Sequence, residues 1–179
     1  MNTTAIRPVP VKVLSLHNKY QRRREKSRWL KGIVLGMGVC GLILYFLVIP
    51  IAGDSLVVQY PEFSGRFWPW MIFLWLTAVP CYAVLFWGWS IASEIGQDRS
   101  FTLKNARSLK WIMVAAIGDT VFFFAGNVIF LLAVINHPAV LLASILVCFI
   151  GVCIAVVAGS LSHLVTKAAG IVEENEAYI

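Results

Sequence analysis

The chain has 179 residues and a net charge of +6, and 59% of its residues are hydrophobic. Ordinary soluble domains contain about 45–50% apolar residues, and a soluble core of this size could not bury so many. The composition therefore excludes an ordinary soluble domain and indicates a membrane protein.

Four long apolar blocks follow one another, at about residues 32–51, 69–91, 111–135 and 139–163. Each is long enough for the ~20 residues that cross a ~30 Å hydrocarbon layer as a helix. We therefore predict an all-α chain that forms an integral membrane four-helix bundle over residues 32–165. A basic segment, 1–31, precedes the bundle and an acidic tail, 166–179, follows it. Pro50 and Gly53 are expected to end the first block.

The positive charges predict the orientation. Nine Lys and Arg residues precede the first block, and Arg99, Lys104, Arg107 and Lys110 lie between the second and third. The other two connections contain only Arg66. By the positive-inside rule, both termini and the middle loop face the cytoplasm of a cell whose plasma membrane the chain crosses several times. The charged lead is longer than that of a cleaved signal peptide, which favours an uncleaved signal anchor.

The basic amino-terminal segment contains Arg22, Arg23 and Arg24 in the run NKYQRRREKSRWLK. One interpretation is a patch that binds anionic lipid headgroups, at about 1 kcal/mol for each Lys or Arg near the surface. The other is that these charges only set the topology. Direct nucleic-acid binding is not expected, because a membrane anchor already accounts for the charge.

Small residues recur at four-residue spacing in two blocks, as Gly32, Gly36 and Cys40 and as Gly151, Ala155 and Gly159. Such stripes let a second helix approach closely, within the chain or in a homo-oligomer. All four cysteines lie inside apolar blocks, which argues against a structural disulfide.

The loop before the third block carries a predicted helix start. Thr102 is placed as an N-cap, with Asn105 three residues later. Lys104, Arg107 and Lys110 then form a basic stripe. This stripe either faces lipid headgroups or provides a docking surface for a cytoplasmic partner or for the acidic tail.

Asp119 lies inside the third block, where an ionised carboxylate is costly and marks a candidate site facing the bundle interior. No Lys or Arg of the apolar blocks is available to pair with it. Asn127 is a second intramembrane polar residue, and Asn127, Thr77, Thr120 and Ser144 are the expected hydrogen-bond partners. Asp119 is either a proton or cation group or a structural polar clamp between helices. Pro80 predicts a kink in the second block.

No HExxH, GxSxG, phosphate-loop or metal-spaced Cys/His pattern is present in the sequence. We therefore predict no catalytic residue, no metal site and no cofactor. His137 and His163 lie at opposite membrane faces and cannot share a haem or a metal.

Three motifs resemble a known family: the loop Ser100-Phe101-Thr102-Leu103-Lys104-Asn105-Ala106, the turn Asn136-His137-Pro138, and the tail from Leu161 through Asn175. The family consists of small bacterial four-span membrane proteins of uncharacterised function, often encoded beside helix-turn-helix regulators. The resemblance covers residues from about 33 onwards and implies the fold and topology, with no activity to carry over. The gene neighbourhood implies a regulatory partner.

The predicted function is that of a non-enzymatic membrane protein whose cytoplasmic loop and tail bind a partner, either a regulator or a larger membrane complex. The alternative is a small oligomeric transporter or channel subunit that uses Asp119, with Pro80 as its flexible point. An enzyme that modifies lipid through scattered polar residues is a third interpretation.

Overall fold

The computed structural model describes residues 11–59, 61–97, 100–136 and 138–177, which are helical apart from short connections at 96–97, 100–102 and 133–136 and contain no strand. The elements are α1 (Val11–Ile43), the π-helical turn η1 (Leu44–Val48), α2 (Ile49–Gln59), the 3₁₀ helix η2 (Pro61–Arg66), α3 (Phe67–Ile95), α4 (Leu103–Leu132) and α5 (Pro138–Ala177). Four helical stretches are long and apolar enough to cross a membrane: Arg28–Gln59, Ser64–Ile95, Leu103–Leu132 and Pro138–Glu174. The predicted all-α class with four spanning helices is therefore confirmed.

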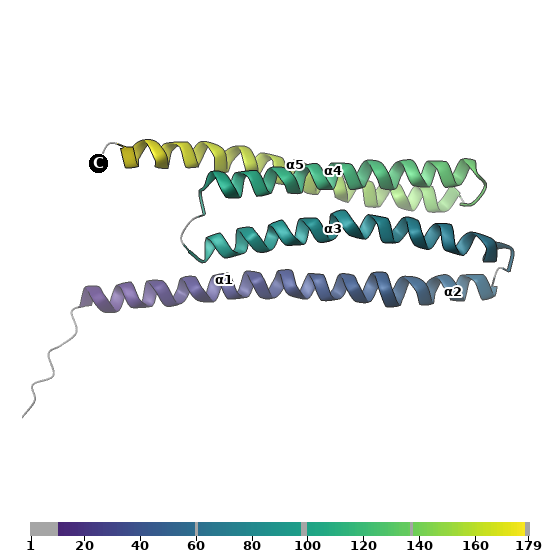
Figure 1. Ribbon diagram of the computed structural model, residues 1–179, viewed down its shortest axis with the longest axis horizontal. Helices are drawn as coiled ribbons and strands as arrows, with labels where there is room; N and C mark the ends of the chain where they lie inside the picture. The colour runs from purple at the N-terminus through teal and green to yellow at the C-terminus, as the bar shows by residue number, and fades with distance from the viewer. Residues whose placement is uncertain (1–10, 60, 98–99, 137, 178–179) are drawn as a thin grey trace, which may run out of the picture.

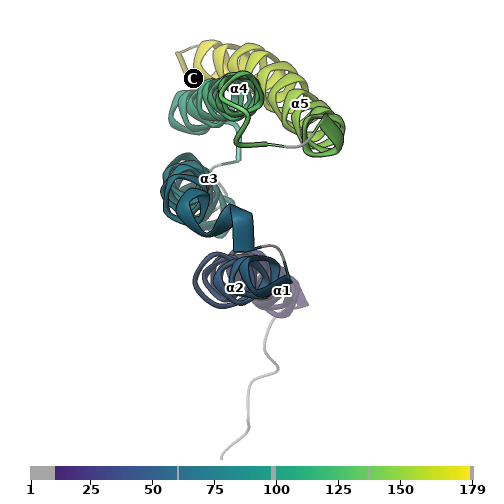
Figure 2. The same cartoon turned by 90° about the vertical axis from the view of Figure 1, so that its right-hand side faces the viewer.

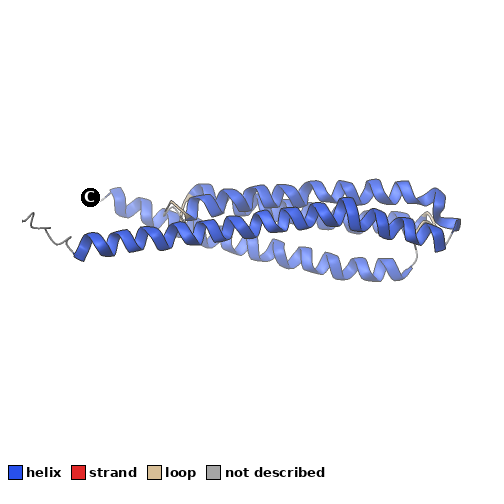
Figure 3. Cartoon of the chain, turned by 90° about the horizontal axis from the view of Figure 1, so that it is seen from below, coloured by secondary structure: helices blue, strands red, loops and turns tan. Residues whose placement is uncertain are grey.

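The four helices run back and forth along one long axis (Figure 1). The start of α1, the α3–α4 loop and the end of α5 lie at one end, which we call the termini end. The α2–α3 and α4–α5 connections lie at the other, which we call the turn end. Figure 3 shows the same arrangement from below, with loops only at these two ends. The start of α1 and the end of α5 therefore lie on the same side of any membrane that the helices cross.

The helices form an open row and do not close around a shared interior (Figure 2). Among the described residues, α1 and α2 contact α3, α3 contacts α4, and α4 contacts α5, but α5 contacts neither α1 nor α3. Large apolar side chains such as Phe86, Leu132 and Phe149 are exposed. Lipid tails solvate such residues as well as a protein core does, so no hydrophobic force closes the row. The arrangement is thus more open than the predicted bundle.

The tightest pair is α4 with α5, because small residues of α5 face α4. Ala155 is 4% exposed. A Cβ added at Gly151 would collide with Thr120, and one at Gly159 would lie 2.7 Å from the Met113 sulfur. The predicted stripe of Gly151, Ala155 and Gly159 therefore lies in this helix contact.

The stripe on α1 lies elsewhere. A Cβ at Gly32 or Gly36 would meet no atom within 4 Å, so no described helix approaches that face. The close approach occurs at Gly41, where an added Cβ would lie 3.0 Å from the Tyr82 hydroxyl of α3. Four-residue spacing identified a stripe of small residues but could not indicate which face of the helix the chain itself uses. Gly32 and Gly36 stay a prediction for contacts between copies.

The expectation that Pro50 and Gly53 end the first helix is wrong, because the chain stays helical to Gln59. The π-helical turn Leu44–Val48 stands directly before Pro50 and widens the helix there, with Ile49 N–H bonded to the Leu44 carbonyl. A widened turn relieves the clash between a proline ring and the preceding turn. Helix α1 begins at Val11, so residues 11–31 of the predicted basic segment are helical as well.

Aromatic side chains mark two levels along the row. Trp87 and Trp111 stack with ring centroids 5.9 Å apart near the termini end, and Trp70 lies 6.3 Å from Phe130 near the turn end. From Trp111 to Phe130 the rise of α4 is about 28 Å, close to the ~30 Å thickness of the hydrocarbon layer. Tryptophan prefers the membrane interface, so the two levels define the depth of every residue between them.

Candidate functional site

Asp119 lies on α4 near the middle of the membrane, about 12 Å from the Trp111 level. It is half-buried and is not enclosed by the helix row. Its Oδ2 atom accepts a hydrogen bond from the Cys81 thiol of α3 at 3.7 Å. Its Oδ1 atom is buried and has no hydrogen-bond partner in the described structure. The carboxyl therefore keeps unused hydrogen-bonding capacity inside the hydrocarbon layer.

The polar contact continues from Asp119 across three helices. The Tyr45 hydroxyl, in the π-helical turn, lies 4.0 Å from the Cys81 sulfur and 3.2 Å from the Thr77 hydroxyl oxygen. Thr77 donates its only hydroxyl proton to the Leu74 carbonyl at 2.7 Å. The Tyr45 hydroxyl must therefore donate to Thr77. The result is a line of polar atoms from α4 through α3 to η1.

The partners expected for Asp119 bond elsewhere. Asn127 is 0% exposed. It donates to the Phe123 carbonyl at 2.9 Å and accepts from Asn136 at 3.1 Å, so it fastens the α4–α5 connection at the turn end. Thr120 and Ser144 donate to carbonyls of their own helices.

Cys81, which does contact Asp119, was considered in the sequence analysis only as one of four cysteines inside apolar blocks, with no role at a site. Its distance from Trp87, about 9 Å along α3, places it near the depth of Asp119. The similar depth of Cys81 and Asp119 in the membrane is the signal by which the sequence could have identified this contact.

The predicted cap of α4 is confirmed, since the Asn105 backbone N–H donates to the Thr102 hydroxyl at 3.3 Å. The basic stripe that follows divides into two parts. Lys104 pairs with Glu94 at the end of α3. In the part of the chain that the structure describes, neither Arg107 nor Lys110 forms a salt bridge.

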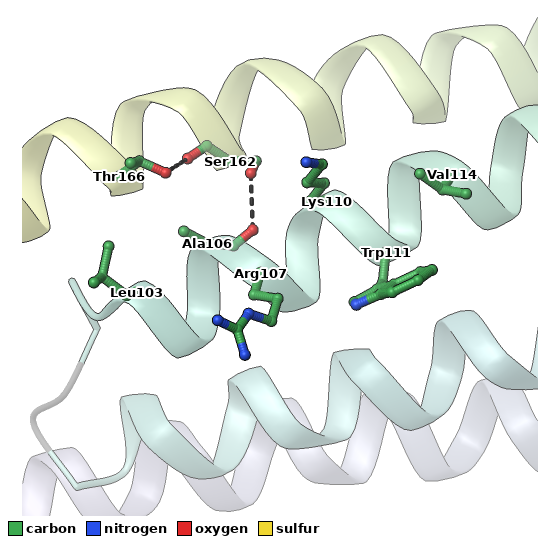
Figure 4. A pocket seen from close by; sticks show the side chains of 8 residues that line it. All are labelled: Leu103, Ala106, Arg107, Lys110, Trp111, Val114, Ser162 and Thr166. Atoms are coloured by element: carbon green, nitrogen blue, oxygen red, sulfur yellow. Dashed lines mark hydrogen bonds between the residues drawn. The ribbon is translucent and has the colours of Figure 1, made fainter.

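Arg107 and Lys110 line a groove of about 500 Å³ between α4 and α5 at the termini end (Figure 4). The other lining residues are Leu103, Ala106, Trp111, Val114, Ser162 and Thr166. In Figure 4, Lys110 extends toward α5, and Arg107 and Trp111 extend from the other side of α4. The groove joins cationic groups to an apolar floor.

Other predicted sites lie partly outside the described structure. Arg22, Arg23 and Arg24 belong to α1, but their side chains lie outside the description, as do His137 and the last two residues of the tail. Glu173 and Glu174 are exposed near the end of α5. Within residues 11–177, apart from the undescribed positions, no three His, Cys, Asp or Glu side chains gather as metal ligands would.

Comparisons with known proteins agree with this architecture. The family model described as "Protein of unknown function (DUF2975)" matches residues 51–179. The chain is 27% identical over 155 residues to the uncharacterized membrane protein YoaS of Bacillus subtilis (strain 168), covering 86% of this chain and 97% of that protein. No solved structure matches. Because the family model covers well over half of the chain, the protein belongs to the DUF2975 family of membrane proteins.

Proposed function

We propose that the protein is a non-enzymatic membrane subunit that binds a partner through the cytoplasmic face of its termini end. The partner is a cytoplasmic regulator or a larger membrane complex. The observation that carries this proposal is the length of α5, which runs for 40 residues and exceeds the ~20 residues needed to cross the hydrocarbon layer.

The last part of α5 projects beyond α4 and α3 at the termini end (Figure 1). The Ser162 hydroxyl donates to the Ala106 carbonyl of α4 at 2.8 Å, which fixes the two helices side by side at that point. From Ser162, α5 continues for about 22 Å to its end at Ala177. On the neighbouring helix, α4 starts at Leu103, only about one turn before Ala106. Figure 1 shows this segment extending past the start of α4.

The projecting segment offers both apolar and acidic side chains. Ile171 is 62% exposed and Val172 is 45% exposed, next to the exposed Glu173 and Glu174. Large apolar side chains outside the membrane, beside charges, are typical of a protein interaction site. The positive-inside rule places this end in the cytoplasm, because the opposite end has only Arg66 in its connections.

The test is site-specific photocrosslinking in intact cells, with the photoreactive residue at position 171 of the full chain. The matched control is position 58 at the turn end, since Val58 is 81% exposed. We expect one discrete protein adduct at position 171, absent at position 58 and lost when Val172→Glu and Glu174→Lys are introduced. Equal adducts at both positions, or an adduct that these substitutions leave unchanged, would contradict the proposal.

A second candidate function, a proton- or cation-linked transporter subunit, is favoured by the unpaired buried Oδ1 atom of Asp119. The open row encloses no pathway of its own, so transport requires several copies. Proton-linked flux in liposomes should be abolished by Asp119→Asn and retained by Asp54→Asn, whose carboxylate is exposed at the turn end. Undiminished flux with Asp119→Asn would remove Asp119 from the mechanism.

A further inference from the structure

We propose that the groove between α4 and α5 binds an anionic phospholipid. Its phosphate would lie between Arg107 and Lys110, and one acyl chain would follow α4 into the membrane. This inference does not depend on the partner-binding proposal, which rests on a different part of the termini end. It rests on the charges, the available donors and the depth of the groove.

The two cations line the same groove. Arg107 and Lys110 are three residues apart on α4, so their Cβ atoms lie about 5–6 Å apart. Their long side chains extend to opposite sides of α4 in Figure 4, so a phosphate between them would be held from two sides. No carboxylate lines the groove, and no described carboxylate forms a salt bridge with either cation. Lys104, one turn away, is already paired with Glu94. The stripe therefore leaves two adjacent positive charges uncompensated inside a concave surface.

The remaining polar groups limit which anion fits. The Ser162 and Thr166 hydroxyls donate to the carbonyls of Ala106 and Ser162, each at 2.8 Å. Each hydroxyl has one proton, so neither is left to donate to a ligand. A ligand anion is therefore held by Arg107 and Lys110, two strong charged donors. A phosphodiester suits this pair, because Arg binds phosphate oxygens in a forked geometry and Lys adds a point charge.

The position of the groove at the headgroup level of the membrane favours a lipid over a soluble phosphate. Trp111 lines it at the level where tryptophan meets the headgroups, and Val114 continues its floor toward the membrane centre. Farther along α4, Ile117 and Val121 are 48% and 62% exposed. A Cβ at Gly118 would meet nothing within 4 Å. A ligand with its phosphate at Lys110 thus has an open apolar track beside it for an acyl chain.

The experiment is native mass spectrometry of the full chain in detergent, titrated with phosphatidylglycerol or with phosphatidylcholine of the same acyl chains. The natural chain should bind phosphatidylglycerol more tightly. The double variant R107Q/K110Q should weaken phosphatidylglycerol binding by about tenfold or more, since each cation near a headgroup contributes roughly a fivefold factor. Phosphatidylcholine binding should change little.

The matched control is E94Q/K104Q, which removes the ion pair outside the groove without leaving an unpaired carboxylate and should weaken binding by less than about twofold. R107K/K110R keeps both charges and should retain the preference for phosphatidylglycerol. Equal binding of the two lipids by the natural chain would overturn the proposal. An equal loss with E94Q/K104Q and R107Q/K110Q, or displacement of the lipid by millimolar glycerol 3-phosphate, would overturn it as well.

Discussion

At the scale of single residues, the Glu94–Lys104 ion pair joins the end of α3 to the start of α4 across the loop at the termini end. The two partners differ in exposure, since the Glu94 side chain is 12% exposed and the Lys104 side chain is 65% exposed. Loss of Lys104 would therefore be costly mainly at Glu94, whose nearly buried carboxylate would keep its charge without a partner.

Lys104→Met should destabilise the protein by about 1–2 kcal/mol, because an uncompensated carboxylate in a mostly buried position is costly even though the lysine is exposed. Unfolding in mixed micelles of increasing SDS content measures the change. The double variant Glu94→Gln/Lys104→Met should recover most of the loss, since it leaves no charge behind. A single variant as stable as the natural chain would show that the pair contributes nothing.

Residue-level prediction from the sequence succeeded where the cause was local. Thr102 was identified as a cap because a cap depends on a hydroxyl and an amide three residues apart. The Asp119 contact was missed because Cys81 is distant in sequence and forms only a weak hydrogen bond. Asn127 was identified as polar and intramembrane, but its bond to Asn136 depends on how the α4–α5 connection folds back.

At the scale of elements, the π-helical turn before Pro50 leaves one carbonyl without a helical donor. The Ile49 N–H bonds to the Leu44 carbonyl, five residues back. In that register the Tyr45 carbonyl would need the N–H of residue 50, which proline lacks. The Trp75 indole of α3 supplies the missing donor at 3.2 Å. The turn and the tryptophan are therefore one structural unit built from two helices.

Trp75→Phe should destabilise the protein by about 1 kcal/mol more than Trp68→Phe, because only the first leaves a carbonyl unsatisfied in the membrane. Trp68 is 63% exposed and is the matched control. Adding Pro50→Ala to Trp75→Phe restores an N–H to the turn and should recover part of the loss. SDS unfolding of the natural chain and these three variants compares them, and equal effects of the two tryptophan substitutions would contradict the assigned role.

The end of α4 contains the other backbone feature with an energetic consequence. Val134 has a φ of 57°, in the left-handed region that β-branched residues rarely adopt. Its side chain is 70% exposed, so it contributes little burial in return. Glycine adopts this conformation without steric cost.

Val134→Gly should therefore stabilise the protein by about 0.5–1 kcal/mol, since relief of steric strain outweighs the added freedom of the unfolded chain. Ala133→Gly is the adjacent control, because Ala133 has a φ of −76° and gains nothing from glycine. Thermal unfolding in one detergent checks both. A Val134→Gly protein that unfolds at a lower temperature than the natural chain would contradict the expectation.

At the scale of the whole molecule, the number of spanning helices followed from composition and block length, because each crossing needs its own run of apolar residues. The packing of the helices against one another could not be predicted from composition and block length. A helix that is apolar on every side gives no periodicity to indicate which face meets a neighbour, and lipid competes with protein for each face. This is why the sequence could not indicate that Gly151 and Gly159 lie in a contact within the chain and that Gly32 and Gly36 do not.

The start of α1, the α3–α4 connection and the end of α5 lie at one end of the row, which makes the topology directly testable. Single cysteines at Phe101→Cys, Ile171→Cys and Val58→Cys occupy exposed positions on the two sides. The first two should react with a membrane-impermeant maleimide only in inside-out vesicles, and the third only in right-side-out vesicles, because the positive-inside rule predicts that the basic end faces the cytoplasm.

The natural chain serves as the background, since Cys40, Cys81, Cys148 and Cys153 lie between the aromatic levels. The nucleophile that adds to maleimide is the thiolate, and the hydrocarbon layer disfavours that charge, so these thiols should stay unlabelled. Labelling of Phe101→Cys and Ile171→Cys from opposite sides would contradict the helix arrangement itself. Labelling of both only from outside would leave the arrangement intact, invert its orientation and remove the cytoplasmic partner from the proposed function.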